Sequence, residues 1–441
     1  MLAPVLERSH TLKQALNDFV LESEGELAQA LESYVAKQLR RGSGDNVQRD
    51  MIVDTFICDG KIADKSPIDL FIQSHTDLST DEINLLQSWH RSLIGLFAIT
   101  EILPDGFDLR NWLTAKHYIV KPNNPKLQQD MLRFKVGEIL LTRISPVSDT
   151  EWIFSGPCTV MGKLGKPKLA VALGNFKDNY RNQLYSDAPD LLEEAWESVE
   201  IYHDQFVEFF GADEVTMPGY QLNKKMGEFQ EIINQKQLEK AGIDTSKSIA
   251  EMAEDAGLES EDIQAAVAEM GGDSSVVSHL LNSKSKMVMP KVDLPVEFRK
   301  AEQVTAISNP RWGQMFLPTY SKMQAILSAD DINTVEGAEK LIRFYLEDKS
   351  INAFIWHRLA KQYPQLETVL QTTLQRPEFN LKNDLDSLLE SHGKLIEPEL
   401  PEIASVPLHL HNLFQEAVAE VHKPKSKPKN LKPVAKGFQR G

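Results

Sequence analysis

The sequence predicts a mixed α+β protein that is mainly helical and carries a small five-stranded β-barrel, of SH3 or OB size, at about residues 93–161. Three observations predict this class. Short β-type segments follow one another there at close spacing, separated by turn residues. On both sides of them, apolar residues recur at three- and four-residue steps, which is typical of amphipathic helices. Beyond Pro398 the chain is broken by prolines and ends in a lysine-rich tail.

Residues 1–92 are expected to form a helical N-terminal unit. Two helix starts are marked there, one by Ser66, which a proline follows, and one by a capping box from Ser79 to Glu82. The apolar run at 51–58 is rich in β-branched residues and suits either a buried helical turn or a strand. The last helix of this unit is expected to lead directly into the barrel.

The barrel unit is expected to span residues 93–168. Its five strands are predicted at 93–102, 107–111, 117–121, 136–144 and 151–161. Pro104, Asp105 and Gly106 form the tight turn between the first two strands. The fourth strand is the most apolar, and we expect it to be central.

The rest of the chain is expected to form four segments. They are a helical unit at 169–247, an acidic helical segment with a linker at 248–295, a second helical unit at 296–397, and a proline-broken segment with a basic disordered tail at 398–441. An amphipathic helix from Pro189, stopped by Gly211, is the clearest element of the first of these. A short amphipathic stretch is also expected at 408–421.

Composition limits the class of protein. The formal net charge is −16, yet the last twenty residues hold six lysines and one arginine without an acid, so the body carries about −23. The acidic body repels nucleic acid and the tail attracts it, so charge does not decide the partner. Two cysteines exclude a disulfide framework and suit a reducing compartment. With no signal peptide and no membrane-spanning run expected, the sequence predicts a cytoplasmic protein.

No catalytic, cofactor or metal motif is predicted. Gly156–Lys163 has the wrong spacing for a phosphate-binding loop, and a leucine stands where a magnesium-ligating hydroxyl is needed. His409 and His411 have the two-residue spacing of a metal-binding pair on a strand, but no further ligand completes the set. We therefore expect no bound metal and no cofactor, and no catalytic residue is assigned.

Two groups of residues are candidates for contact with a partner. Arg311, Trp312 and Phe316 lie in an expected loop between helices, where Trp312 suits either core packing or a protein contact, since these residue types are enriched in hot spots. Lysines in the loop after the barrel and in the tail are candidates for contact with an anion or RNA. They are Lys163, Lys166, Lys168, Lys423, Lys425, Lys427 and Lys429.

Residues 66–161 resemble a region of bacterial proteins that end in a SEC-C metal-binding tail. The similar segments are Ser66–His75, Leu78–Glu82, Leu85–Trp89, Gly95–Ile102, Phe107–Thr114 and Val136–Arg143. The cysteine-rich zinc tail itself is absent, so the resemblance implies neither zinc nor the ribosome or translocase contacts of that tail. The general character of the chain is similar to that of cyanobacterial proteins. The resemblance supplies no catalytic residue.

The sequence therefore favours a non-catalytic protein-interaction, assembly or regulatory factor. An RNA- or ribosome-associated factor, acting through the basic tail and a barrel face, is the alternative. An enzyme with an unrecognised site is the third reading, and a pocket lined by perturbed carboxylates would bring it forward.

Overall fold

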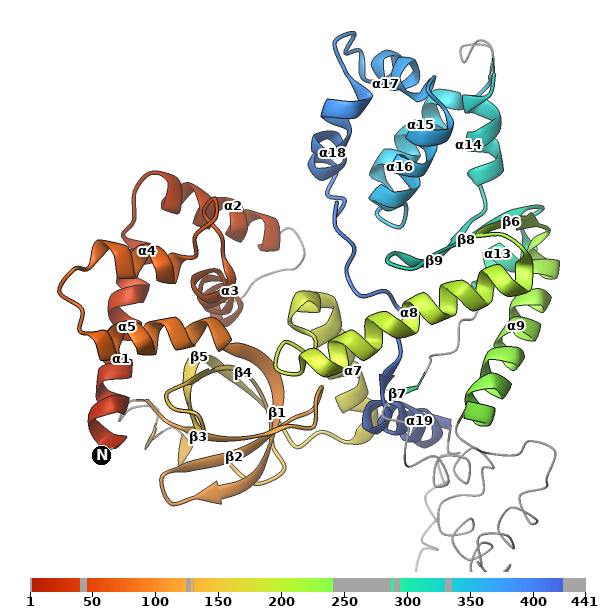
Figure 1. Cartoon of the computed structure of the whole chain (residues 1–441). Helices are drawn as coiled ribbons and strands as arrows, with labels where there is room; N and C mark the ends of the chain where they lie inside the picture. Colours follow the sequence, from red (N-terminus) through yellow and green to blue (C-terminus); the bar gives the residue numbers. More distant parts are fainter. Residues whose placement is uncertain are drawn as a thin grey trace, which may run out of the picture. The chain divides into compact units, whose positions relative to one another are not determined.

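A computed structural model describes most of the chain. The described residues are 2–39, 46–123, 128–129, 131–240, 287–288, 294–329 and 335–422. They fall into two compact units (Figure 1). The first runs to Asn179 and also takes in the chain from His409, and the second runs from Tyr180 to Leu408. The acidic stretch at 248–283 and the tail lysines lie outside the described residues.

The first unit begins with helices. They are α1 (Leu2–Leu21), α2 (Glu26–Leu39), α3 (Asn46–Asp59), α4 (Pro67–Ser74) and α5 (Thr80–Ser88), followed by the 3₁₀ turn η1 (Trp89–Arg91). Both expected helix starts are confirmed, because Ser66 and Ser79 each form a complete capping box. The ambiguous run at 51–58 is helical and lies within α3. Leu16, Phe56, Ile68 and Leu86 are buried in the core that these helices share.

Five strands follow η1 directly. They are β1 (Leu93–Leu103), β2 (Gly106–Asn111), β3 (His117–Lys121), β4 (Ile139–Pro146) and β5 (Glu151–Gly162). The expected strands are confirmed to within three residues at each end. Their order, β1-β2-β3-β5-β4, returns to β1, so the sheet is closed around Phe97, Leu140 and Phe154. All pairs are antiparallel except β3 with β5.

The expectation that the fourth strand is central is wrong. β4 is as apolar as expected, but it pairs with β1 on one side and with β5 on the other, as every strand of the closed sheet pairs with two neighbours. A closed sheet has no edge and therefore no centre. The apolar character of β4 instead reflects burial on both faces, since Leu140 faces the interior of the sheet and Arg143 faces the helices.

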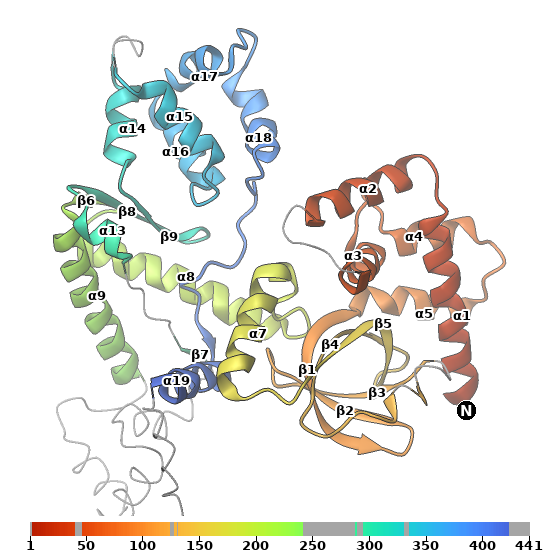
Figure 2. The ribbon, with the colours of Figure 1, turned by 180° about the vertical axis from the view of Figure 1, so that it is seen from behind.

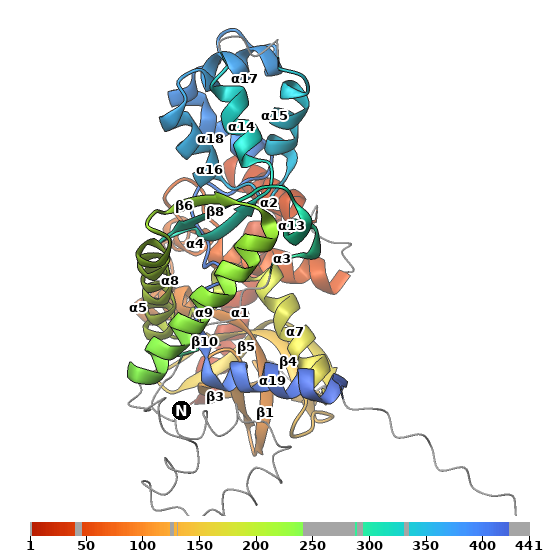
Figure 3. The same ribbon diagram turned by 90° about the vertical axis from the view of Figure 1, so that its right-hand side faces the viewer.

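Two more helices complete the first unit. They are α7 (Lys166–Asn179) after the sheet and α19 (Leu408–His422) near the C-terminus. α19 matches the amphipathic stretch expected at 408–421, and Leu410, Leu413 and Ala417 form its buried side. Figure 3 shows α7 beside α19. Lys166 of α7 forms an ion pair with Glu416 of α19.

The second unit starts with a helical hairpin and a small sheet. Its elements are η2 (Arg181–Gln183), α8 (Pro189–Phe210), β6 (Glu214–Met217), α9 (Gly219–Lys240), α13 (Val296–Lys300), β8 (Val304–Asn309) and β9 (Gly313–Leu317). α8 confirms the predicted helix, and Gly211 ends it with φ of 79°, a left-handed conformation that glycine adopts without strain. The segments 169–247 and 296–397 are thus not wholly helical as expected, since β6, β8 and β9 form an antiparallel sheet.

The second unit ends in a group of five helices. They are α14 (Tyr320–Leu327), α15 (Ala338–Glu347), α16 (Ala353–Gln362), α17 (Leu366–Leu374) and α18 (Leu381–Ser391). Figure 2 shows these helices gathered in one group. Their shared core contains Trp356, Tyr345 and Leu370 and extends onto Met315 of β9. We expected Phe344 and Tyr345 to be core residues; Tyr345 is buried, and Phe344 is exposed. The strands β7 (Met287–Val288) and β10 (Val406–Pro407) pair antiparallel, so part of the expected linker is held in a small ladder.

Among the described residues, no helix is long and apolar enough to cross a membrane.

Candidate functional site: a groove between α16, α17 and α18

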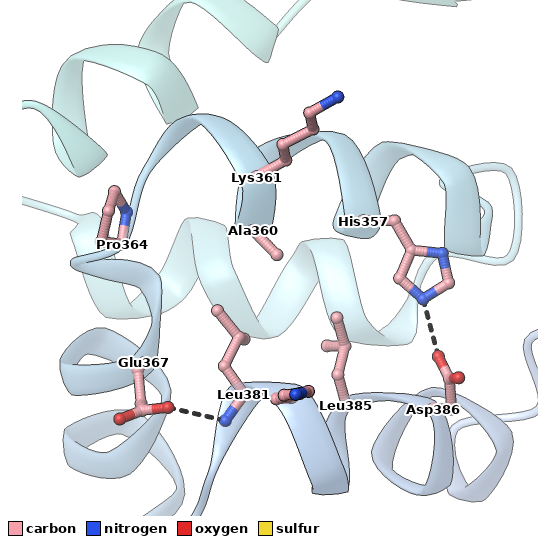
Figure 4. A pocket seen from close by; sticks show the side chains of 9 residues that line it. His357, Ala360, Lys361, Pro364, Glu367, Leu381, Leu385 and Asp386 are labelled. Atoms are coloured by element: carbon pink, nitrogen blue, oxygen red, sulfur yellow. Dashed lines mark hydrogen bonds and ion pairs between the residues drawn. The ribbon is translucent and has the colours of Figure 1, made fainter.

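A groove of about 560 Å³ lies at the surface of the five-helix group of the second unit (Figure 4). Nine residues line it. They are His357, Ala360, Lys361, Pro364, Glu367, Leu381, Lys382, Leu385 and Asp386. This volume is within the usual range for ligand sites, and the groove is open to solvent rather than enclosed.

Helix α16 supplies one wall of the groove. Its N-terminus is capped by Asn352, whose side chain accepts a hydrogen bond from the backbone N–H of Ile355. Trp356 and Leu359 point into the core, so the residues four apart on the opposite face, His357 and Lys361, are exposed at the groove.

Helix α18 supplies the facing wall. Asn380 caps it by accepting from the backbone N–H groups of Lys382 and Asn383. Leu381 and Leu385 lie one turn apart and, together with Ala360 and Pro364, form the apolar floor.

The two carboxylates of the groove already have hydrogen-bond partners. Asp386 Oδ1 lies 2.7 Å from Nε2 of His357. Glu367 of α17 accepts from the backbone N–H of Leu381 over 2.8 Å, at the positive end of α18 (Figure 4). Asp386 therefore links α18 to α16, and Glu367 links α17 to α18.

The titratable groups of the groove are exposed or half-buried, and no hydroxyl or thiol is among its lining residues. A His–Asp pair orients an imidazole for proton transfer, but none of the nine lining residues carries a hydroxyl or thiol that it would activate. Neither the histidine nor the aspartate is buried, so no water-excluded centre is present at this place.

A second polar cluster lies inside the first unit, between α1, α3 and β4. Arg143 is fully buried and donates from Nε to Asp54 over 2.8 Å and from Nη2 to Asp59 over 2.7 Å. Lys13 Nζ lies 2.9 Å from Asp54 and donates to the sulfur of Cys58 over 3.7 Å.

The electrostatics of this cluster favour the charged forms of Lys13 and Arg143 and the neutral thiol of Cys58. Burial alone would lower the pKa of Lys13, but the adjacent Asp54 outweighs it and the pKa is raised. Burial likewise opposes the charge of Arg143, and its acidic neighbours overcome it and raise its pKa. Burial raises the pKa of the Cys58 thiol, so Cys58 stays protonated and unreactive. The cluster joins helices to sheet and is not open to a ligand.

The expected partner contact in the second unit is only partly accessible. Arg311 and Trp312 lie in the turn between β8 and β9, not between helices as expected. Trp312 packs against the core of the five-helix group, and Arg311, although exposed, stacks over the ring of Trp196 at 4.1 Å. Phe316 is half-buried on β9. Trp312 is half-buried against that core, and its contact with a partner stays a prediction.

The expected anion-contacting lysines of the first unit surround the start of α7. Lys166 and Lys168 lie in the first turn of that helix, and Lys163 lies just before it. The loop after the sheet, which we expected at residues 162–168, therefore ends before Lys166. All three are exposed, and Lys166 pairs with Glu416. Lys423, Lys425, Lys427 and Lys429 fall outside the described residues.

The histidines and cysteines take other roles. His409 Nε2 hydrogen-bonds the carbonyl oxygen of Trp112 over 2.7 Å and lies on a helix, not on a strand. In the part of the chain that the structure describes, no three His, Cys, Asp or Glu side chains gather in a way that could hold a metal ion. Cys58 and Cys158 are both free.

The groove was missed by sequence reasoning. His357 with Lys361 and Leu381 with Leu385 each show the four-residue spacing of one helix face, which was a signal available in the sequence. The spacing does not show which faces of two helices meet. Comparison with family models, with curated proteins and with solved structures gives no match for this chain.

Proposed function

We propose that the protein is a non-catalytic interaction factor and that the groove between α16, α17 and α18 binds a segment of a partner protein. The observation that carries the proposal is the composition of the groove, an apolar floor with charged residues of both signs at its rim. Apolar concavities with a few placed polar groups are the usual form of binding sites. The two cysteines of the chain, Cys58 and Cys158, are free, which fits a cytoplasmic factor.

We further propose that the closed sheet is a small barrel of the OB type. Its five strands close in the order β1-β2-β3-β5-β4, and β3 runs parallel to β5. The same region resembles the one that accompanies SEC-C tails, and this too stays a proposal.

The β2–β3 side of this barrel favours protein over nucleic acid as the partner of the chain. Lys121 forms ion pairs with Asp105 and Glu151. Nδ1 of His117 lies 3.0 Å from Oδ1 of Asp108 on β2. Arg110 stacks on Trp112 within the same chain. A nucleic-acid surface needs unpaired cations with free aromatic faces, and these cations are occupied.

The test compares partners recovered with two charge-matched variants of the full chain. K361E/K382E reverses the charge of the groove rim, and K340E/K349E changes two exposed lysines elsewhere in the same helical group by the same amount. Affinity purification from native cells is expected to lose a partner with K361E/K382E and to retain it with K340E/K349E. Identical recovery with wild-type protein and both variants would contradict a role for the groove.

An RNA- or ribosome-associated factor is the second candidate. The observation that favours it is the exposure of Lys163 and Lys168 around the start of α7, and the sequence of residues 423–441 adds six lysines and one arginine. Co-sedimentation with ribosomes at rising salt tests it. A steep salt-dependent loss that K163Q/K168Q or removal of residues 423–441 makes shallower supports this candidate.

A further inference from the structure

One end of the closed sheet is basic, although the chain as a whole is acidic. The first residue of β4 pairs with the last residue of β5, so residues 131–138 and 160–168 meet there, and the structure describes all of them. The side chain of Lys163 runs alongside Gly137, with its Cε 3.7 Å from a Cβ built on that glycine. We call these two stretches the basic end. They hold five cations and one carboxylate, in a chain whose formal net charge is −16.

Most of the cations of the basic end have no ion pair. Lys166 pairs with Glu416 of α19, and Glu138, the one carboxylate here, accepts a hydrogen bond from the backbone N–H of Lys135. The four other cations are exposed and form no ion pair with any residue that the structure describes. They are Arg133, Lys135, Lys163 and Lys168. A surface of this charge attracts an anionic partner.

Large aliphatic side chains are exposed between these cations. They are Leu132 at 82%, Val136 at 48%, Val160 at 45% and Met161 at 37%. Phe134, the one aromatic residue of the basic end, instead packs inward against Phe107, with ring centroids 5.6 Å apart. The exposed apolar groups are therefore aliphatic chains, and the basic end offers no ring on which a nucleic-acid base stacks.

Helix α19 extends this surface toward the C-terminal tail. The ion pair of Glu416 with Lys166 sets the last turns of α19 beside the basic end, and in these turns Val418 and Val421 are 55% and 67% exposed. Glu416 is less than two turns from the end of the helix, about 9 Å along its axis. The sequence of residues 423–441 then adds six lysines and one arginine without an acid. Seven further cations therefore start close to the basic end.

We infer that the basic end is a docking surface for an anionic lipid bilayer, on which the protein lies without crossing it. Aliphatic side chains enter the boundary between headgroups and acyl chains, while lysine and arginine keep their charged heads at the lipid phosphates. Both features are needed, because a little apolar insertion or a few cations alone gives only weak attachment. The same lipids repel the acidic remainder of the chain, so the basic end faces the bilayer.

A protein is the competing occupant of such a surface. The centre of a protein interface is packed, depleted of charge and enriched in aromatic residues. At the basic end each apolar group instead has a cation close by, as Leu132 has Arg133 and Val136 has Lys135. Cations set among aliphatic residues match the boundary of an anionic bilayer, where charge and hydrocarbon lie side by side.

The experiment measures the binding of the full chain to lipid vesicles by flotation. Vesicles of phosphatidylglycerol and phosphatidylcholine in equal parts are compared with vesicles of phosphatidylcholine alone, at low and at high salt. R133Q/K163Q removes two charges from the basic end. The control K61Q/R91Q removes one lysine and one arginine charge at exposed positions elsewhere in the first unit.

A second pair of variants tests the apolar contribution. L132S/V136S removes one leucine and one valine from the basic end, and the control V5S/L21S removes the same two residue types from exposed positions on α1. A third variant ends the chain at His422. Each protein is assayed with both kinds of vesicle.

Wild-type protein is expected to bind the phosphatidylglycerol vesicles at least about tenfold more tightly than the phosphatidylcholine vesicles at low salt, since each cation near an anionic surface gives roughly a factor of five. High salt should weaken this preference. R133Q/K163Q is expected to lose at least about tenfold in binding, and removal of residues 423–441 more than that. L132S/V136S should also bind more weakly, and both controls should bind as wild-type protein does.

Some outcomes would overturn the inference without any variant. They are equal binding to both kinds of vesicle and the absence of binding to either. Equal losses in R133Q/K163Q and K61Q/R91Q would show that net charge acts and not this surface. If fluorescein-labelled oligouridine binds, R133Q/K163Q abolishes that binding and no vesicle is bound, the basic end is a nucleic-acid site. None of these results bears on the groove between α16, α17 and α18, whose partner is tested separately.

Discussion

Arg143 on β4 donates a hydrogen bond from Nε to Oδ2 of Asp54 on α3 over 2.8 Å, in a place that water does not reach. The pair joins the helices of the N-terminal region to the closed sheet, two parts that the sequence presents as separate units. Both charges are buried, so removing Asp54 leaves Arg143 with Asp59 alone, and removing Arg143 leaves Asp54 with Lys13 alone.

We expect Asp54→Ala to destabilise the first unit by about 3–5 kcal/mol, since Arg143 and Lys13 both lose a buried carboxylate. Amide hydrogen exchange of α3 and β4 measures this locally, which is useful in a chain of two units. Asp149→Ala, at an exposed loop position, is the control and should change protection by less than about 0.5 kcal/mol. Equal protection in both variants would show that the buried pair does not hold helices and sheet together.

Two glycine-to-alanine substitutions are expected to have opposite signs. A Cβ on Gly156 would lie 2.6 Å from Oδ2 of Asp54 and 3.0 Å from Cβ of Arg143, so Gly156→Ala should displace the ion pair and cost about 1–3 kcal/mol. Gly174 lies within α7 with nothing inside 4 Å of the added Cβ, so Gly174→Ala should stabilise by roughly 0.5–1 kcal/mol. Urea denaturation of each variant measures the change in unfolding free energy. Stabilisation by Gly156→Ala would show that residue 156 does not lie tightly against Asp54 and Arg143.

The docking of α19 on the first unit should weaken in acid. Burial lowers the pKa of His409 below its usual 6.5, and Arg110 acts in the same direction against the opposing hydrogen bond to Trp112. Between the folded pKa and 6.5 the undocked helix binds more protons, so docking gains stability as pH rises through this window and loses it as pH falls.

Hydrogen exchange of α19 amides, corrected for the intrinsic pH dependence of exchange, measures this effect. We expect lower protection below pH 6 than at pH 7.5 in wild-type protein. His409→Gln should remove most of the difference, because a glutamine amide can hydrogen-bond the same carbonyl without titrating. A difference of the same size in His409→Gln would assign the pH dependence to another group.

Lys394 should make the stability of the second unit rise in mild alkali. Its Nζ is buried and donates to the carbonyl oxygens of Asp348 and Ile351 over 2.6 and 2.7 Å, and burial lowers its pKa to about 8. Between pH 8 and the ordinary lysine pKa of 10.5 the unfolded chain binds more protons than the folded chain. The free energy of unfolding therefore rises with pH across this window, by roughly 1–3 kcal/mol from this group.

The comparison that isolates Lys394 is the difference in unfolding free energy between wild-type protein and Lys394→Met at several pH values. Tyrosines and cysteines titrate in the same window, and they cancel in this difference. We expect the unfolding free energy of wild-type protein to rise relative to that of the variant between pH 8 and 10.5. A difference that stays constant would mean that Lys394 has an ordinary pKa in the folded chain.

Local signals in the sequence were sufficient where a structure depends on neighbouring residues. The capping boxes at Ser66 and Ser79, the helix end at Gly211 and the limits of the five strands all follow from residues a few positions apart. Caps, left-handed glycines and alternating burial act within one element, so one element is enough to show them.

The sheet of β6, β8 and β9 shows where such signals end. β6 is four residues long and pairs with β8 across about ninety residues of chain, as Thr216 with Thr305. A strand this short has too few alternations to be told from the end of a helix. The same limit explains why Trp312 was expected between helices. It lies in the turn between β8 and β9, two short strands that were not recognised in the sequence.

The sequence by itself determined the α+β class, the helix starts, the five strands and an amphipathic helix at 408–421, because each depends on backbone preferences and the apolar period of one segment. Only the tertiary structure decided that β1 closes onto β4, that Arg143 meets Asp54, and that α16, α17 and α18 line one groove. These relationships join residues that are distant in the chain. They depend on which faces pack together, and a pattern within one element does not contain that information.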